Sequence, residues 1–292
     1  MKGIYFLPVA ALLLSAGIAP PVRQGPVVVA TSPALAPVVR QLAARFAREP
    51  GGTTISVIAP GSDVAMAHLT TGKADLAVIG RPAFEQEAKA FEWVYQVPVK
   101  AHPLFAGTTA RPGLSAPLAF RVNAANPLRA VTQEQLQTAF AQGDPGLTWD
   151  RLGVGTGLSG KTIRLVMPDS ESGTGRFLRA RVLADQVQFP WSRVTEVSVS
   201  GPRADQFGAR IAAAVARDPQ ALGVGDPLPV KGTRVLAVVV EGKAYLPGQA
   251  GYPYGRTIMA YDAPSPRPEI GAFVRFLGSP AARAELARAG FD

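Results

Sequence analysis

The chain has 292 residues, 47% of them hydrophobic, which is enough material for the cores of two ordinary domains. Lys and Arg number 30 against 21 Asp and Glu, and the resulting net charge of +9 favours negatively charged partners; because the basic residues are scattered singly, we expect no nucleic-acid partner. Cysteine is absent and histidine occurs only twice, which excludes disulfides and cysteine nucleophiles and leads us to expect no metal site and no cofactor.

The N-terminus is typical of an export signal. Met1 and Lys2 precede an apolar stretch at residues 4–19, which has the length of a signal-peptide core and is short for a bilayer span. Residues 1–19 are therefore predicted to be a signal peptide. An uncleaved anchor is the alternative, because Pro20 would follow the cut. No other stretch is long and apolar enough to cross a membrane, so we expect a soluble protein in the periplasm or outside the cell.

Three expected strands are each followed by a serine and then by a helical pattern. The strands are expected at residues 27–30, 55–59 and 163–167, and the serines are Ser32, Ser62 and Ser172. Each serine is a candidate N-cap, because its oxygen can accept from N–H groups one turn further on. Gly173 and Thr174 follow the third serine, and the glycine lets a ligand approach the backbone closely. The free N–H groups and positive dipole of such a helix start attract anions, although a simple capped helix is the alternative.

In an open α/β fold, strand-to-helix loops gather at the carboxyl edge of the sheet, where ligands bind. The three junctions are therefore predicted to converge on one small anion, with Thr31 joining Ser32 at the first of them. A further strand is expected at residues 76–79 and ends at Gly80 and Arg81. We interpret Arg81 as a ligand arm, because a guanidinium makes paired contacts with oxyanions; an exposed loop cation is the alternative.

The middle of the chain alternates between strand and helix patterns. A short helix is expected near Glu85, strands at residues 94–99 and 118–122, and a crossing into a second lobe at 123–128. A capped helix is expected at residues 132–140. Trp149 is expected to anchor the packing of the loop-rich stretch that follows.

Residues 155–162, G-T-G-L-S-G-K-T, match the pattern of a phosphate-binding P-loop. That geometry needs a strand before the loop and a helix after it. Neither is expected here, because a loop precedes the pattern and an apparent strand follows it. We therefore expect no nucleotide site.

The last third of the chain supplies the remaining elements. Helices are expected at residues 204–217 and 268–289, the second with a break at 278–280, and strands at 221–225, 235–240 and 257–261. No internal repeat has a fixed period.

Taken in order, several motifs resemble the substrate-binding proteins of phosphate-type ABC transporters. They are T-S-P-A-L-A-P at residue 31, A-P-G-S-D-V-A-M at 59, G-K-A-D-L-A-V-I-G-R at 72, N-P-L-R-A-V-T-Q-E-Q-L at 126, S-E-S-G-T-G-R-F at 170 and Y-P-Y-G-R-T-I-M-A-Y at 252. The resemblance implies a type II-like fold of two α/β lobes, hinged by two crossing strands and closing on a dehydrated oxyanion. We expect lobe 1 at residues 25–122 with 227–292 and lobe 2 at 123–226.

By this resemblance the binding site comprises Thr31, Ser32, Ser62, Ser172, Gly173 and Thr174. Two positions depart from the family pattern. Pro168 stands where phosphate binders usually carry Arg, and Arg81 stands near the place of a frequent Asp. A carboxylate there can accept a hydrogen bond from hydrogen phosphate and repels sulfate, which has no proton to offer, so its loss predicts poor discrimination between the two anions.

The expected function is therefore that of a monomeric, non-catalytic binding protein. It would capture a small oxyanion, which the resemblance identifies as phosphate, and present it to a membrane ABC permease. One alternative is a secreted serine hydrolase that uses Ser172, although no general base is evident beside it. The other is a signalling or interaction protein that kept the fold and lost the ligand, which Pro168 makes plausible.

Overall fold

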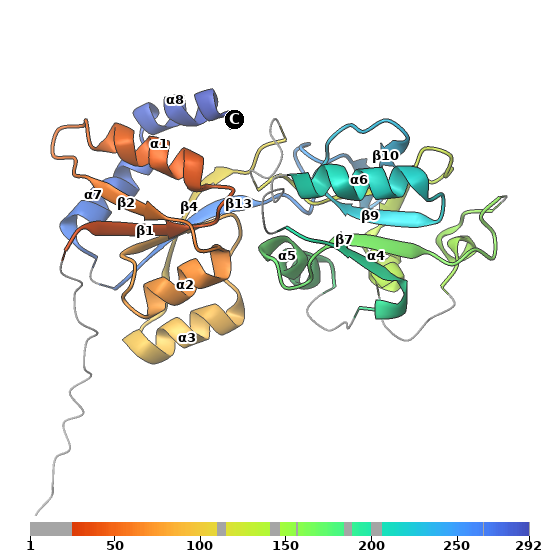
Figure 1. Ribbon diagram of the computed structural model, residues 1–292, viewed down its shortest axis with the longest axis horizontal. Helices are drawn as coiled ribbons and strands as arrows, with labels where there is room; N and C mark the ends of the chain where they lie inside the picture. Colours follow the sequence, from red (N-terminus) through yellow and green to blue (C-terminus); the bar gives the residue numbers. More distant parts are fainter. Residues whose placement is uncertain are drawn as a thin grey trace, which may run out of the picture.

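The computed structural model describes residues 25–109, 115–140, 147–155, 157–183, 189–199, 206–264 and 266–291. The signal peptide expected at residues 1–19 lies outside these ranges. The described chain forms two α/β lobes side by side, each built on a mixed five-stranded sheet (Figure 1). The expected two-lobe fold class is thereby confirmed.

The first lobe is a sheet of strand order β2-β1-β3-β13-β4, covered by helices on both faces. Its strands are β1 (Val27–Thr31), β2 (Ile55–Ile58), β3 (Leu76–Ile79), β4 (Lys100–Ala106) and β13 (Thr257–Asp262). Its helices are α1 (Ala36–Phe46), α7 (Pro268–Leu277) and α8 (Pro280–Ala289) on one face and α2 (Ser62–Thr70) and α3 (Glu85–Tyr95) on the other (Figure 1). Val27 and Val29 face the first group of helices and Val28 and Ala30 the second, which explains why β1 is apolar throughout.

The second lobe contains a sheet of order β10-β5-β9-β7-β8 and a smaller one of order β12-β11-β6. The larger sheet consists of β5 (Ala119–Asn123), β7 (Arg164–Pro168), β8 (Val194–Val197), β9 (Ala221–Gly225) and β10 (Thr233–Val235). The smaller consists of β6 (Ala130–Thr132), β11 (Ala237–Val240) and β12 (Lys243–Tyr245). The helices are α4 (Gln133–Phe140), α5 (Gly173–Val182), α6 (Phe207–Arg217) and the short turns η1 (Trp149–Leu152) and η2 (Trp191–Arg193).

Trp149 confirms its expected role as a packing anchor in the second lobe. Its ring is fully buried in the largest apolar cluster, and its Nε1 donates to the Gln220 carbonyl at 3.2 Å. The P-loop pattern ends in a turn that leads directly into β7, so no helix follows it. The geometry that a P-loop requires is therefore missing from residues 157–168.

Strand pairing corrects the expected lobe boundaries. β5 pairs with β9 and β10, and β11 pairs with β6, so all of these strands belong to the second lobe. The chain therefore crosses between β4 and β5 and again between β12 and β13, rather than near residues 123 and 226. The turn-rich stretch after β5 is a tight turn within the second lobe, where Asn126 N–H donates to the Asn123 carbonyl at 2.9 Å.

One strand prediction is also wrong. Residues 94–99 were expected to be extended, but α3 runs to Tyr95 and ends at Gln96 in the left-handed conformation. The β-branched and aromatic residues that suggested a strand serve the helix instead, because Tyr95 stacks on Phe91 with ring centroids 4.4 Å apart. The strand itself begins at Lys100.

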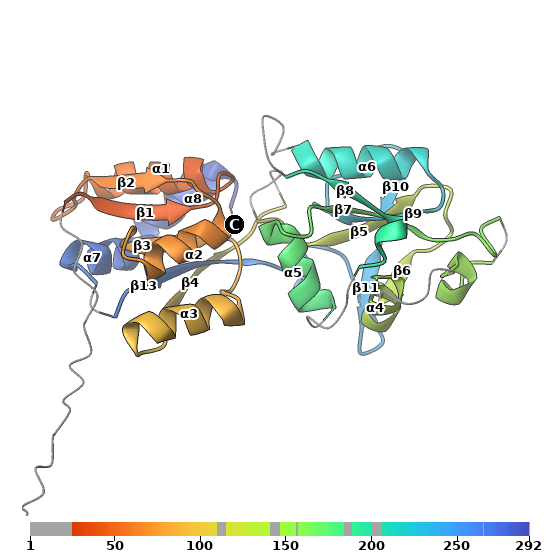
Figure 2. The same cartoon turned by 60° about the horizontal axis from the view of Figure 1, so that its bottom comes forward.

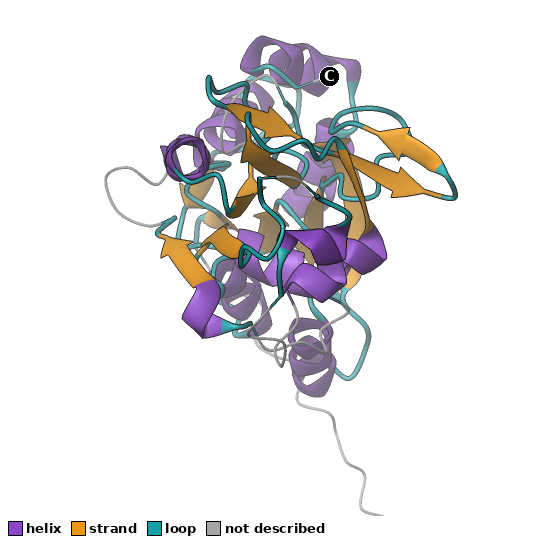
Figure 3. Ribbon diagram, turned by 90° about the vertical axis from the view of Figure 1, so that its right-hand side faces the viewer, coloured by secondary structure: helices purple, strands orange, loops and turns teal. Residues whose placement is uncertain are grey.

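The two crossing segments are hydrogen-bonded to each other. Gly107 N–H donates to the Arg256 carbonyl at 2.8 Å, and Leu118 N–H donates to the Tyr254 carbonyl at 2.9 Å. Figure 2 shows β4 and β13 running side by side toward the second lobe, and Figure 3, viewed along the long axis, shows most strands between layers of helices. In the described part of the chain, no helix combines the length and apolar character needed to span a bilayer.

Candidate functional site

The junction between β7 and α5 has the cap that the sequence predicts. Ser172 occupies the N-cap position, and its Oγ accepts from Gly175 N–H at 3.0 Å. The same hydroxyl donates its proton to the Asp169 carbonyl at 2.5 Å. Both hydrogen-bonding roles of Ser172 are therefore used within its own turn.

The start of α5 leaves backbone donors free. The N–H groups of Gly173 and Thr174 lie at the start of the helix, where no carbonyl of the helix itself can accept from them. No other group among the described residues accepts from them either. These two N–H groups carry the positive end of a ten-residue helix. The N-terminal end of α5 is therefore suited to binding an anion.

The corresponding junction of the first lobe lies opposite. A methyl group placed on Gly173 would lie 3.7 Å from Ser62 Oγ, with no closer neighbour. The first turns of α2 and α5 thus face each other across the two lobes. Ser62 and Gly173, predicted separately, are brought together.

Two of the three predicted caps are wrong in detail. Ser32 starts a turn in which Leu35 N–H donates to its Oγ at 3.3 Å, and α1 begins only at Ala36. Ser62 is the first helical residue of α2, and Gly61 takes the cap position with φ 111°, a conformation that favours glycine. Neither serine side chain therefore serves as a helix cap.

Thr31 connects these two junctions. Its buried Oγ1 donates to the Val78 carbonyl at 2.6 Å, and its own carbonyl accepts from Gly61 N–H at 3.3 Å. Thr31 and Ser32 at the end of β1 are therefore tied to the loop that carries Ser62. The loops after β1, β2 and β3 meet at one edge of the sheet because the three strands are parallel neighbours.

Arg81 is buried and held by two carboxylates. Only 2% of its surface is exposed. Its guanidinium donates to Glu87 Oε1 at 2.7 Å and Oε2 at 2.8 Å and to Asp63 Oδ1 at 2.5 Å, and it stacks 3.7 Å above the Phe84 ring. Burial alone lowers the pKa of Arg81, but the hydrogen bonds and charges of Glu87 and Asp63 raise it above its ordinary value. Arg81 is thus engaged with protein carboxylates, contrary to its interpretation as a free ligand arm.

Asp63 places a carboxylate beside the junction. Its Oδ2 lies 3.4 Å from Arg176 Nε of the second lobe, while its Oδ1 contacts Arg81 of its own lobe. Arg176 also pairs with Glu171 on its own side at 3.0 Å. A chain of alternating charges therefore runs from Arg81 through Asp63 and Arg176 to Glu171.

Arg256 is the cation that the sequence analysis missed. It lies on the second crossing segment, and its Nη1 donates to Thr174 Oγ1 at 3.1 Å. Burial lowers the pKa of Arg256 to about 10, against the opposing effect of Asp226, so the guanidinium stays charged at neutral pH. Its Nε is buried with no hydrogen-bond partner in the described structure, and its Cζ lies 4.9 Å from the centroid of the Phe177 ring. Arg256 stands within the motif that begins at residue 252, but nothing in that motif reveals the contact with Thr174.

Pro168 is the last residue of β7 and offers no donor at the place where an Arg was expected. Arg256 brings a guanidinium to the same helix start from the crossing segment. The departure at Pro168 therefore does not leave the junction without a cation.

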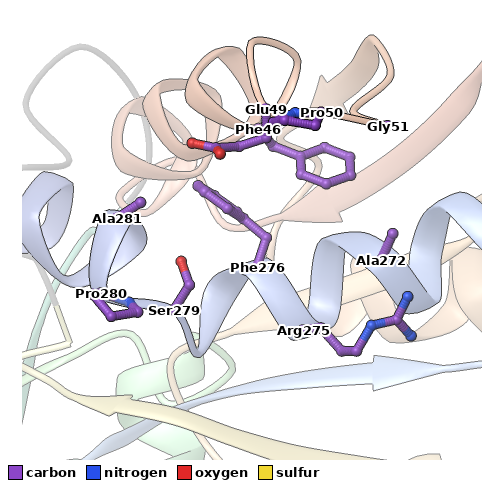
Figure 4. Close-up of a pocket in the computed structure, with 10 residues that line it drawn as sticks. All are labelled: Phe46, Glu49, Pro50, Gly51, Ala272, Arg275, Phe276, Ser279, Pro280 and Ala281. Carbon is purple, nitrogen blue, oxygen red and sulfur yellow. The ribbon is translucent and has the colours of Figure 1, made fainter.

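Two surface hollows lie away from this junction. One, of about 460 Å³, lies between the end of α1 and the break between α7 and α8, with Phe46 and Phe276 in its wall (Figure 4). The other, of about 440 Å³, is lined by the loop from Pro227 to Lys231 together with Thr233 and Val235. Neither includes a predicted site residue.

Comparisons with known proteins agree with this architecture. A family model described as a PBP superfamily domain matches residues 18–281. An ABC-type phosphate transport receptor from Vibrio cholerae superimposes with a TM-score of 0.65 at 20% identity, over 91% of this chain and 98% of its own. PstS from Borrelia burgdorferi gives 0.62 at 15% identity, over 92% and 98%, and a structure with bound phosphate from Clostridium perfringens gives 0.58 at 16%, over 90% and 97%. No curated protein matches the sequence.

Proposed function

The chain belongs to the PBP superfamily, a family of binding proteins, and on that premise we propose that it is an exported receptor for a small oxyanion. It captures the anion between its lobes and delivers it to an ABC permease, without catalysis. Phosphate is the leading ligand. Two structures of this fold support that choice, since one is an ABC-type phosphate transport receptor and another contains bound phosphate.

The observation that carries the proposal is the position of Arg256. Its charged, partly unsatisfied guanidinium contacts Thr174 at a helix start whose first two N–H groups are free. Ser62 of the other lobe faces the same helix start. Backbone donors, a hydroxyl and a guanidinium are the groups that bind oxyanions in proteins, and here they come from both lobes and the crossing segment.

Asp63 changes the expected selectivity. The argument for poor discrimination between phosphate and sulfate required a site without a carboxylate. Asp63 lies next to Ser62 and provides one at the edge of the junction. Because a carboxylate repels sulfate, which has no proton to offer, more strongly than protonated phosphate, we expect phosphate to bind in preference to sulfate, and competition titration of the two anions at neutral pH measures the difference.

The hydrolase alternative requires a base for the Ser172 proton. In the structure the Ser172 hydroxyl donates a hydrogen bond to the Asp169 carbonyl oxygen, and a carbonyl oxygen does not act as a base at neutral pH. Sustained turnover of an activated ester or phosphoester, lost in Ser172→Ala, would favour the hydrolase over a receptor. A protein that binds none of the oxyanions tested would instead favour the signalling alternative.

Arg256→Gln tests the proposal directly. We expect phosphate binding, measured by isothermal titration, to weaken about tenfold to a hundredfold, as for loss of a hydrogen bond to a charged group. Arg164→Gln is the matched control. It removes the same charge at the opposite end of β7, where Arg164 pairs with Asp218 at 3.3 Å, and it should leave affinity unchanged. Equal affinity of wild type and Arg256→Gln would contradict the proposed site. Mass spectrometry of ligand released from purified protein identifies the anion independently.

A further inference from the structure

Arg176 lies in the first turn of α5, beside the proposed oxyanion site. It is one helical turn after Ser172, so its side chain leaves the helix on the same face as the cap. Its Nε faces Asp63 of the first lobe, and Asp63 directly follows Ser62. Arg176 therefore reaches across the same contact between lobes that brings Ser62 to Gly173.

The ion pair between Asp63 and Arg176 is long and weak. The Nε to Oδ2 distance of 3.4 Å exceeds the 2.7 to 2.9 Å of charge-assisted hydrogen bonds, and Nε is buried with no hydrogen-bond partner. Arg176 Nη2 donates to Glu171, and within the described residues no group accepts from Nη1. The guanidinium thus retains donors that an incoming oxyanion can use.

We propose that Arg176 is a ligand-binding residue and that Asp63 is an internal anion that holds its guanidinium until an oxyanion displaces the carboxylate. This inference rests on the proposed function. It deepens that function by adding a binding residue and a competitor that belongs to the protein itself.

The exchange is possible because Asp63 and Arg176 each have a second ion-pair partner in their own lobe. When the contact breaks, Asp63 keeps Arg81 at 2.5 Å in the first lobe, and Arg176 keeps Glu171 at 3.0 Å in the second. Side chains of Asp63 and Arg176 are 32% and 37% exposed, so water screens the contact and it is a weak one. A weak pair with a second partner on each side is easily replaced by a ligand.

The sign of the effect of Asp63→Asn decides the question. If the carboxylate competes with ligand, its neutralisation should tighten phosphate binding about twofold to fivefold in titration calorimetry, the range for an exposed ion pair. If Asp63 instead closes the lobes together with the ligand, the same change weakens binding. Weaker or unchanged binding overturns the proposal. Arg81 remains paired with Glu87 in this variant, and a thermal melt verifies the fold.

Glu171→Gln is the control for long-range charge. It removes an equal charge that also contacts Arg176, but from within the second lobe. We expect it to change affinity less than Asp63→Asn does. If both variants gained the same phosphate affinity, the change in net charge alone would explain the effect, and the proposal that Asp63 competes with the ligand would be wrong.

Arg176→Gln tests the same exchange from the other side. We expect it to weaken phosphate binding about tenfold, and we expect Asp63→Asn to give no further gain in that background. Affinity within twofold of wild type in Arg176→Gln, or a full gain in the double variant, overturns the proposal. These outcomes are distinct from failure of the proposed function, in which the wild type binds no oxyanion and Arg256→Gln changes nothing.

Discussion

At the scale of single residues, Arg81 shows how a plausible ligand arm becomes part of the structure. The sequence places it at the end of a strand, where an exposed guanidinium is ready for an anion. The fold buries it and surrounds it with Glu87 and Asp63. Removal of one partner from a buried ion pair leaves the remaining charge uncompensated, which is costly.

We therefore expect Arg81→Ala to lower the free energy of unfolding by about 3 kcal/mol or more in urea denaturation. Arg45→Gln is the control, because its ion pair with Glu49 is partly exposed, and it should cost about 1 kcal/mol or less. If Arg81→Ala were as stable as wild type but bound no phosphate, the original interpretation as a ligand arm would be correct.

At the scale of elements, the sequence predicts helices and strands better than the contacts between them. The helix break near Gly278, the strand at residues 221–225 and the Ser172 cap are all confirmed, because apolar spacing and cap chemistry act locally. The contacts of Asp63 with Arg176 and of Arg256 with Thr174 join residues distant in the chain, whereas Arg81 is held by Glu87 six residues further on. Arg256, for example, reaches a threonine 82 residues before it, and no local pattern encodes that contact.

The first turn of α5 gives a matched pair of glycine substitutions. A methyl group on Gly175 would lie 2.2 Å from the Asp169 carbonyl oxygen, so we expect Gly175→Ala to cost about 1–3 kcal/mol of stability in a denaturant melt. On Gly173 the nearest atom would be Ser62 Oγ at 3.7 Å, so Gly173→Ala should retain stability. It should weaken phosphate binding, because the methyl group occupies the space between the lobes. Unchanged affinity in a stable Gly173→Ala protein would place the anion elsewhere.

At the scale of the whole molecule, two segments cross between the lobes. The segments hydrogen-bond to each other beside Gly107 and Leu118. Such a paired connection permits rotation of one lobe against the other while both sheets stay intact. The contacts across the lobes include Asp63 with Arg176, which is weak enough to break on opening.

We expect saturating phosphate to reduce the radius of gyration measured by small-angle X-ray scattering, because a ligand held by both lobes favours the closed form. Arg256→Gln, which should bind poorly, is the control and should show a smaller change at the same phosphate concentration. Identical scattering curves for the wild type with and without ligand would contradict hinge closure.

The position of β13 also determines the order in which the molecule can be completed during synthesis. β13 lies between β3 and β4 and is the only described strand with which β4 pairs. The strands of the second lobe all lie between Ala119 and Tyr245, so they leave the ribosome before β13 does. Until residue 262 has emerged, β3 keeps an open edge and β4 has no neighbour. The lobe that contains the beginning of the chain is thus the last to acquire its finished sheet.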